Sequence, residues 1–525
     1  MAEPVLQDAT SASRPQPAEV ALLASVFVVA ACGLVYELVA GALASYLLGD
    51  SVLQFSTIIG TYLFAMGVGS YLSRFYDRQL IAHFLRIELL VGVLGGLMPA
   101  ALFVLHSVSP SSFRFALYGL VGAIGVLAGL EIPLVMRILK RYFQARYALK
   151  NLVSEVLTFD YLGALAVSIA FPLLLVPHLG LVRSGLLFGL LNVAVAIWAL
   201  ILFRGELRNF KAEAIACLLA LATLLIAFWG AERITTWAED RFYADPVIFT
   251  AQSPYQRLVV TGRNDRVRLH LNGNLQFDSR DEYRYHEALV HPAMTAARSP
   301  RQVLILGGGD GMAAREVLKY SSVEQVTLVE LDPQMTELFS RHKLLRQLNG
   351  QALQSSKVQV IHADAFGWLE RNSQLAQPRR FDVVIVDFPD PTNFSIGKLY
   401  THTFYQLLQD ALSQSGWAVV QTTSPLLARK SFWTVAYTLE AAGWQVTPYH
   451  AHVPSFGEWG FILAAHRSYP QQVAPLPAGL RFLTPSVQAT LFSFPPDMSR
   501  LPTETNRLSN QGLVRTFAAE WGRVQ

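Results

Sequence analysis

The chain has 525 residues, of which 52% are hydrophobic and 15% carry charge, so it is too apolar for one ordinary water-soluble protein and too long for one domain. Residues 1–230 carry 14 Lys/Arg and 12 Asp/Glu, against 28 and 26 in residues 231–525, and neither part has the basic surface that nucleic acid requires. The only two cysteines, Cys32 and Cys217, lie in apolar runs, which excludes a disulfide framework and a cysteine-rich metal site.

Residues 1–18 are polar, contain prolines and predict a flexible tail. The chain then has seven apolar stretches long enough to cross a hydrocarbon core, which takes roughly 20 helical residues. They are Val20–Ser45, Val52–Leu72, Ile81–Val104, Phe113–Ile138, Leu157–Val176, Leu181–Phe203 and Ala214–Trp229. The first is longer than the apolar region of a cleaved signal peptide, and its leader carries only Arg14. Residues 19–230 are therefore predicted to be a membrane domain of about seven transmembrane helices, with the lipid bilayer as partner and the cell membrane as location.

Basic residues are concentrated in every second connection of this bundle. The connections after the second, fourth and sixth stretches contain Arg74, Arg78, Lys140, Arg141, Arg146, Lys150, Arg204, Arg208 and Lys211. The other connections offer only Arg114 and Arg183, so the basic connections and the amino terminus are predicted to be cytoplasmic. Seven spans would then place residues 231–525 on the opposite face, whereas a count that differs by one would place them in the cytoplasm. The sequence leaves both open.

Four acidic residues fall inside the apolar stretches: Glu37, Glu88, Glu131 and Asp160. Charges at membrane depth are costly and usually face a bundle interior or a water-filled path. A functional interpretation is a conduit for a polyamine or another cation. The structural alternative is pairing within the bundle, for example of Glu88 with Arg86.

Residues 231–298 are predicted to form a linker and a small β-domain. Two short strands, Val267–Leu271 and Leu275–Phe277, flank Asn272-Gly273-Asn274. Because Asn and Gly readily adopt the left-handed conformations of a tight turn, this pattern predicts a hairpin.

Residues 299–470 show the pattern of a Rossmann-like sheet, followed by a carboxyl-terminal extension over 471–525. A buried strand, Val303–Leu306, leads into a glycine loop and then into a helical stretch, Met312–Tyr320. The loop glycines are Gly307, Gly308, Gly309 and Gly311. The next strand, Val326–Val329, ends in Glu330, where a carboxylate can accept hydrogen bonds from both hydroxyls of a ribose.

Further acidic residues follow the strand ends. Asp364 follows the strand Val358–Ile361, Asp387 follows Phe381–Val386, and Asp310 lies in the glycine loop. Such a loop usually favours an anion, but Asp310 disfavours a phosphate and would attract an ammonium or sulfonium. With Asp390, these carboxylates predict a pocket for a cationic nucleoside and a second cation.

Several segments in this order resemble the polyamine aminopropyltransferases, the spermidine synthase family, over roughly residues 253–464. They are Ser253-Pro254-Tyr255-Gln256, Asp281-Glu282-Tyr283-Arg284-Tyr285-His286-Glu287, Gly307–Gly311, Val329-Glu330-Leu331-Asp332, Asp387-Phe388-Pro389-Asp390-Pro391 and Leu399-Tyr400-Thr401. The apolar first part looks like the multi-pass extension of some bacterial members. The resemblance implies a membrane bundle fused to an α/β domain with a methyltransferase-type sheet, preceded by the small β-domain.

The resemblance also implies roles for individual residues. Decarboxylated S-adenosylmethionine would be held by Gln256, by Asp310 at its aminopropyl ammonium, by Glu330 at its ribose, and by Asp364 and Ala365 at its adenine. Tyr285 and His286 would meet the amine acceptor beside Asp390, and Asp387 would be the catalytic base. The sulfonium is already a good leaving group, so no metal and no further cofactor are expected.

The sequence departs from the family pattern mainly on the acceptor side. Many members have Asp at Asn272, Ser or Thr at Phe388 and Pro389, and a tyrosine near Phe456. Trp459 fits either a wall of the amine channel or ordinary strand-end packing. His291 and His362 are interpreted as structural, because neither has neighbours at metal-ligand spacing.

The predicted activity is transfer of an aminopropyl group from decarboxylated S-adenosylmethionine to putrescine, which gives spermidine and methylthioadenosine. One alternative is an S-adenosylmethionine-dependent methyltransferase, which Asp310 disfavours by repelling the substrate carboxylate. Another is a polyamine transporter or sensor without catalysis. The sequence leaves the amine acceptor and assembly into homo-oligomers open.

Overall fold

The computed structural model describes residues 17–48, 51–142 and 149–523, and the chain divides into two compact units between Ala244 and Asp245. Residues 1–16 of the predicted tail lie outside the described residues, and so does Arg146. Each unit is described by itself.

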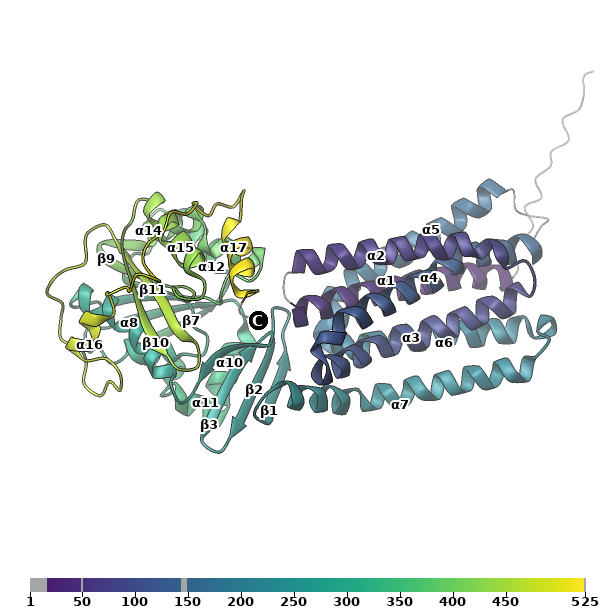
Figure 1. The fold of residues 1–525 in the computed structure, drawn as a ribbon, viewed down its shortest axis with the longest axis horizontal. Coiled ribbons are helices and arrows are strands. Elements are labelled where there is room, and N and C mark those ends of the chain that lie inside the picture. Colours follow the sequence, from purple (N-terminus) through teal and green to yellow (C-terminus); the bar gives the residue numbers. More distant parts are fainter. Residues whose placement is uncertain (1–16, 49–50, 143–148, 524–525) are drawn as a thin grey trace, which may run out of the picture. The chain divides into compact units, whose positions relative to one another are not determined.

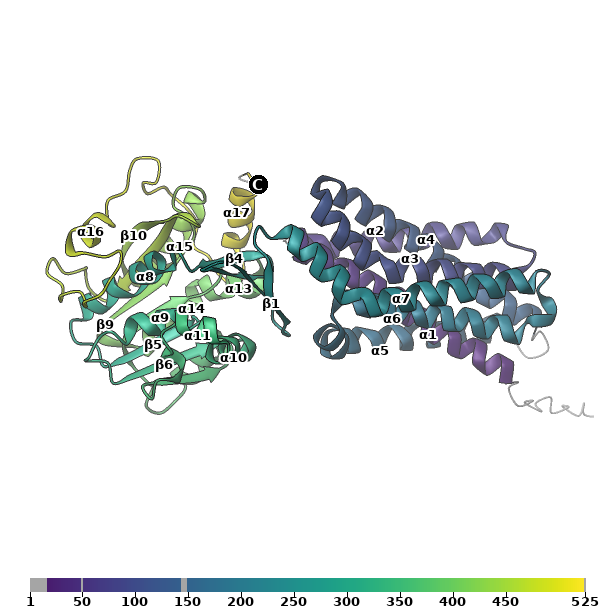
Figure 2. The same cartoon turned by 90° about the horizontal axis from the view of Figure 1, so that it is seen from below.

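The described part of the first unit is built from long apolar helices that run side by side (Figures 1 and 2). They are α1 (Pro17–Leu48), α2 (Ser51–Leu72), α3 (Leu80–Val108), α4 (Pro110–Tyr142), α5 (Leu149–Ala170), α6 (Val176–Leu202) and α7 (Phe210–Phe242). Six continuous helical segments among the described residues are long and apolar enough to cross a membrane. The fold therefore contains the predicted bundle of apolar helices.

The segment Leu152–Leu202 explains why six segments are found where the sequence predicts seven stretches. Its 51 residues would extend about 77 Å as one straight helix, more than twice the thickness of a hydrocarbon core of about 30 Å. The helix is interrupted by a wider π turn over Phe171–Leu175 and by Gly180, whose φ of 71° is not helical. The π turn separates α5 from α6, and Gly180 interrupts α6 near its beginning.

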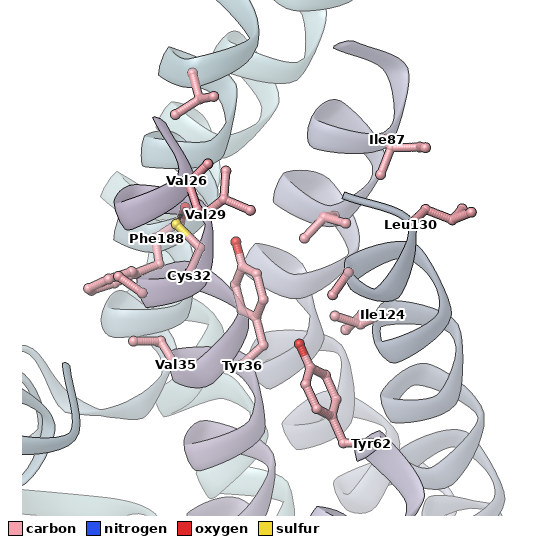
Figure 3. Close-up of a cluster of buried hydrophobic side chains, with 14 of the residues drawn as sticks. Val26, Val29, Cys32, Val35, Tyr36, Tyr62, Ile87, Ile124, Leu130 and Phe188 are labelled. Atoms are coloured by element: carbon pink, nitrogen blue, oxygen red, sulfur yellow. Dashed lines mark hydrogen bonds between the residues drawn. The ribbon is translucent and has the colours of Figure 1, made fainter. Parts of the chain in front are cut away.

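The interior of this unit is packed with apolar side chains from several helices. Val26 and Tyr36 from α1, Tyr62 from α2 and Phe188 from α6 lie together in the bundle (Figure 3). Glu88 is fully buried and accepts a hydrogen bond from Asn192 at 2.8 Å. The suggested pairing of Glu88 with Arg86 is wrong, because Arg86 Nε donates instead to Glu213 Oε1 at 2.8 Å.

The second unit begins with an antiparallel sheet of four strands in sequence order. These are β1 (Val247–Gln252), β2 (Arg257–Arg263), β3 (Arg266–Leu271) and β4 (Asn274–Asp278). Asn272 and Gly273 between β3 and β4 have φ angles of 49° and 82°. Two successive positive φ angles are typical of the tight hairpin turn that the Asn-Gly pair predicts.

A seven-stranded sheet in the order β10-β11-β9-β8-β5-β6-β7 forms the centre of the second unit. Its strands are β5 (Gln302–Gly307), β6 (Gln325–Glu330), β7 (Val358–His362), β8 (Phe381–Asp387), β9 (Leu412–Gln421), β10 (Gln445–Val453) and β11 (Gly457–Ala465). Strands β5 to β9 are parallel, and β11 and β10 add an antiparallel edge. This is the predicted Rossmann-like sheet of methyltransferase type.

Helices cover both faces of this sheet (Figure 1). The side chains of β5 alternate, so Leu304 and Leu306 face one core while Val303 and Ile305 face the other. The first core includes α12 (Ala365–Ser373), α14 (His402–Ala411) and α15 (Arg429–Ala441). The second includes α8 (Glu282–Ala297) and α9 (Met312–Val317), a helix that ends three residues earlier than predicted.

The remaining α-helices of the second unit are short and lie between the strands or after the last strand. They are α10 (Pro333–Arg341), α11 (Lys343–Leu348), α13 (Phe394–Gly397), α16 (Pro485–Thr490) and α17 (Gly512–Trp521).

The carboxyl-terminal segment that contains α16 and α17 is attached by hydrogen bonds to a buried carboxylate. Glu287 on α8 accepts backbone N–H groups from Arg481, Phe482 and Leu483 at 2.8–2.9 Å. Residues 481–483 are therefore fixed to α8, and the carboxyl-terminal segment belongs to the second unit.

Candidate active site

The carboxyl ends of the parallel strands bring the predicted acidic residues to one edge of the sheet. β5 ends at Gly307, β6 at Glu330 and β8 at Asp387. Gly307 is paired in register with Asp387 across β5 and β8. In open α/β sheets this edge is where ligands bind. Glu330 and Asp387 therefore lie on the two sides of the glycine loop.

The glycine loop is shaped so that it passes close to both carboxylates. Gly307, Gly308 and Gly311 have φ angles of 82°, 64° and 77°, which other residues rarely adopt. A Cβ atom at Gly308 would lie 3.2 Å from Asp387 Oδ2, and one at Gly309 would lie 2.7 Å from Glu330 Oε2. Larger residues would therefore displace the carboxylates that line the site.

Asp310 is buried in this loop and shapes the start of α9. Its Oδ1 accepts the N–H of Met312 at 2.9 Å, and its carbonyl oxygen accepts a hydrogen bond from the Asn349 side chain at 2.8 Å. These bonds fix the residue while leaving the second carboxylate oxygen available to a cation. The predicted role of Asp310 toward the aminopropyl ammonium stays a prediction.

Asp387 is held by a tyrosine from α8. The Tyr285 hydroxyl donates to Asp387 Oδ1 at 2.7 Å. Burial raises the pKa of Asp387 to about 6, although the His286 cation and the Tyr285 hydroxyl favour its ionised form. A carboxylate with a pKa near neutrality is suited to accept a proton during a reaction.

His286 is buried beside Tyr285 and Asp387, and its ring forms a hydrogen bond with Glu282, one helical turn earlier in α8. Its Nδ1 lies 2.8 Å from Glu282 Oε2. Burial disfavours the imidazolium, but the hydrogen bond and the charge of Glu282 outweigh it and raise the pKa of His286 to about 9. Arg315 Nη1 donates to Glu282 Oε1 at 2.9 Å and holds that carboxylate from the other side. At neutral pH a positive charge therefore faces Asp387.

Asp390 follows Asp387 by three residues in the loop after β8. Its Oδ1 is buried and has no hydrogen-bond partner, and burial raises the pKa of Asp390 to about 7. Because an unpaired buried carboxylate is costly, this oxygen is positioned to bind a cationic group.

Hydrogen bonds from neighbouring elements fix the loop that carries Asp390. The Tyr400 hydroxyl donates to the carbonyl oxygen of Pro389 at 3.0 Å, and the Gln421 amide donates to that of Phe388. Trp459 Nε1 in turn donates to Gln421 Oε1 at 3.1 Å. Trp459 is thus connected through Gln421 to the loop that carries Asp390, and the centroid of its ring lies 5.2 Å from that of Phe456.

At the end of β6, each oxygen of the Glu330 carboxylate accepts one hydrogen bond from the chain. Oε2 accepts the N–H of Gly309 at 3.1 Å, and Oε1 accepts the N–H of Asp332 at 2.9 Å. Burial raises the pKa of Glu330 to about 7, although these two hydrogen bonds favour the ionised form. Each oxygen can accept a further hydrogen bond, as a ribose diol would require.

The other predicted donor residues lie at the edges of this site. Gln256 Nε2 donates to Asp332 Oδ2 at 2.9 Å, which attaches the loop between β1 and β2 to the end of β6. Asp364 caps α12 by accepting the N–H of Gly367 at 3.2 Å, and its Oδ2 lies 3.1 Å from Lys398 Nζ. Ala365 is buried at the start of that helix.

Three residues that build the site were given no role by the sequence analysis. Asp332 holds Gln256, Glu282 holds His286, and Gln421 holds the loop of Asp390. The spacing of Glu282 and His286, four residues apart on a helix, could have indicated their contact. Nothing local in the sequence links Asp332 to Gln256 or Gln421 to Phe388.

The two histidines interpreted as structural are engaged in internal hydrogen bonds. His291 lies 3.0 Å from Glu316 and 2.9 Å from the Tyr320 hydroxyl, and His362 lies 2.8 Å from the Thr336 hydroxyl. Within the described ranges, no three His, Cys, Asp or Glu side chains are grouped as metal ligands would be.

Comparison with known proteins gives matches to the whole chain and to its second unit. The Spermine/spermidine synthase domain family matches residues 282–474. Polyamine aminopropyltransferase 1 of Ralstonia nicotianae is 55% identical, with 98% of each chain covered. Polyamine aminopropyltransferase of Leptospira interrogans is 48% identical and covers 96% of this chain and 99% of its own. A solved spermidine synthase in complex with the transition state analogue AdoDATO is 28% identical, with a TM-score of 0.43, over 47% of this chain and 85% of that chain.

Proposed function

Because this chain belongs to the polyamine aminopropyltransferase family, we propose that it transfers the aminopropyl group of decarboxylated S-adenosylmethionine to putrescine, giving spermidine and methylthioadenosine. The observation that carries this proposal is the pair of carboxylates at the end of β8 and in the loop that follows it. Asp387 is oriented by Tyr285, and the buried oxygen of Asp390 lacks a partner.

In this proposal the donor lies across the strand ends. The ribose hydroxyls bind Glu330, the aminopropyl ammonium binds Asp310, and the adenine lies beside Asp364 and Ala365. Gln256, held by Asp332, closes the donor side. Asp310 favours the decarboxylated donor, because it would repel the carboxylate of ordinary S-adenosylmethionine.

The acceptor amine lies on the other side of Asp387. Its remote ammonium binds Asp390, and Tyr285 and Trp459 line its path. The resemblance implies that His286 meets the amine, but its positive charge would repel an ammonium. We therefore propose that His286 acts on Asp387 instead, because it favours the ionised form of that carboxylate.

The reaction then needs one proton transfer and one displacement. The lone pair of the attacking nitrogen forms a bond to the carbon next to the sulfonium, and the carbon–sulfur bond breaks with its electron pair going to sulfur. The attacking nitrogen loses a proton to Asp387, and neutral methylthioadenosine leaves. Fixed carboxylates that align the amine supply the proximity on which such a displacement depends.

We further propose that residues 19–230 are the membrane domain and that the enzyme is a multi-pass protein of the cell membrane. The support is the length and apolar composition of its helices. Residues 299–470 would hold the sheet of the catalytic domain, and residues 471–525 would extend it. The predicted connection over residues 231–298 needs correction, because α7 continues to Phe242 and the second unit begins at Asp245, so residues 245–298 would belong to the catalytic unit.

The test is a product analysis with the purified full-length chain. Decarboxylated or ordinary S-adenosylmethionine would be supplied with putrescine, cadaverine or spermidine, and the products identified by mass spectrometry. We expect spermidine and methylthioadenosine from the decarboxylated donor and putrescine. A methylated amine would support a methyltransferase instead, and amine binding without any product would support a transporter or sensor.

A further inference from the structure

The membrane unit contains a cavity that plays no part in the proposed reaction. Its volume is about 140 Å³, roughly ten times what one water molecule needs. Three carboxylates line it from three different helices: Glu37 from α1, Glu131 from α4 and Asp160 from α5. Tyr62 from α2 also lines the cavity, and its hydroxyl donates to the carbonyl oxygen of Gly33 at 3.1 Å.

Glu131 is the residue that indicates a ligand. Its side chain is 3% exposed, and its Oε1 has no hydrogen-bond partner. No lysine, arginine or histidine is among the residues that line the cavity. A buried polar atom without a partner is costly, and acidic groups at this depth usually face a partner or a path for one.

Three of the basic residues in the described bundle have partners away from this cavity. Arg86 pairs with Glu213, Arg183 lies 3.2 Å from Glu232, and Arg137 donates to the carbonyl oxygen of Ser73 at 2.7 Å. Among the described residues that line the cavity, none supplies a counter-ion to the three carboxylates, and a bound cation could do so.

The form of the cavity favours an organic cation over a metal ion. Within the described residues these carboxylates are not grouped closely enough to hold one metal ion together. The walls between them are aliphatic and include Val26, Leu34, Ile132 and Val135. Separated carboxylates joined by apolar walls fit separated ammonium groups joined by methylene groups. Glu37 and Asp160 are only partly buried, whereas Glu131 is buried, so we take the end at Glu37 and Asp160 as the entrance of the cavity.

We propose that this cavity is a second binding site for an aliphatic diamine or polyamine, separate from the catalytic site. Glu131 binds one ammonium group at the buried end of the cavity, and Glu37 and Asp160 bind the other near its entrance. The site gives the membrane unit a ligand of the same chemical class as the family's substrates. The argument rests on the cavity and does not depend on Asp387 or on the identity of the acceptor.

The test is equilibrium dialysis of radiolabelled putrescine against the full-length chain in lipid nanodiscs, without donor so that no turnover occurs. We expect a component of binding that is weakened at least about tenfold by the combined substitution Glu37→Gln, Glu131→Gln and Asp160→Asn, the scale of lost charge-assisted hydrogen bonds. Ala164→Leu keeps every carboxylate but fills the cavity, so it should weaken the same component. Glu232→Gln, an exposed acid on α7, should leave it unchanged.

Two results would overturn the proposal. One is putrescine binding that is identical in the wild type, in the triple variant and in Ala164→Leu. The other is butylamine binding to the cavity as tightly as putrescine, because a single ammonium would then suffice. Methylthioadenosine release from the same preparations tests the proposed function independently, and the variants should leave it within about twofold of the wild-type rate.

Discussion

At the scale of single residues, the site places carboxylates where their charge is disfavoured until a cationic substrate arrives. Asp387, Asp390 and Glu330 all have a raised pKa because of burial. The His286 cation and the Tyr285 hydroxyl partly offset the rise in the pKa of Asp387. The pKa of Asp390 is raised by burial without such an offset. Asp390 is therefore the residue whose charge most needs a ligand.

Asp390→Asn should weaken the enzyme's use of its amine and stabilise the fold. The folded-state pKa of about 7 lies above the ordinary value of 3.8, so stability falls as pH rises from about 4 to 7 and the full cost is present at pH 8. The substitution removes that cost, which is on the order of 1–4 kcal/mol. We expect a higher Tm by calorimetry at pH 8 and a raised KM for the amine. A lower Tm at pH 8 would show that the charge is already compensated within the fold.

The same titrations predict the acid limb of activity. Asp387 and Asp390 have pKa values of about 6 and about 7. At a pH below these values the carboxylates are protonated, so they can neither accept a proton nor bind an ammonium. The value of kcat/KM for the amine should therefore rise between pH 5 and 8. In Asp390→Asn the limb should keep only the lower transition, near pH 6. An unchanged limb in that variant would assign the upper transition to another group.

At the scale of elements, α8 joins the site to the rest of the second unit. One part of it presents Tyr285 and His286 to Asp387, while Glu287 accepts three backbone N–H groups of residues 481–483. Glu287 is 1% exposed. The helix therefore holds residues 481–483 while it positions the side chains that we propose act on Asp387.

Glu287→Gln should destabilise the second unit without removing its chemistry. The new amide nitrogen cannot accept a hydrogen bond, so at least one buried N–H group loses its partner, at a cost of about 1–3 kcal/mol. We expect a lower Tm, with kcat retained at temperatures where the variant is folded. Glu324→Gln is a matched control, because that side chain is 58% exposed in a surface pair. If both variants have the wild-type Tm, the three hydrogen bonds contribute little to stability.

The elements also show what the sequence could predict. Asn272-Gly273 predicts the hairpin because a turn depends on local backbone conformations, and the apolar run before Gly307 predicts a buried strand for the same kind of reason. The contacts of Asp332 with Gln256 and of Gln421 with Phe388 join residues more than 30 positions apart. Such pairs depend on how the strands are ordered, which no local pattern contains. The division of Leu152–Leu202 likewise depends on the backbone at Gly180.

At the scale of the whole molecule, every residue assigned to the reaction belongs to the unit that begins at Asp245. That unit has its own cores on both faces of its sheet, and both cysteines of the chain lie outside it. The helices of the first unit supply none of the assigned catalytic groups. We therefore propose that the second unit catalyses the reaction, whereas the first unit anchors the enzyme and binds amine.

The most direct test of this account is the rate of methylthioadenosine release by residues 245–525 alone, supplied with decarboxylated S-adenosylmethionine and putrescine. We expect a folded fragment with a rate close to that of the full-length chain. Asp387→Asn in the fragment should lower the rate by about 100-fold to 10,000-fold, the usual contribution of a positioned general base. The exposed control Asp410→Asn should not change it. A folded fragment without activity, restored by the membrane unit, would contradict the account and make Glu37, Glu131 and Asp160 candidates for the active site.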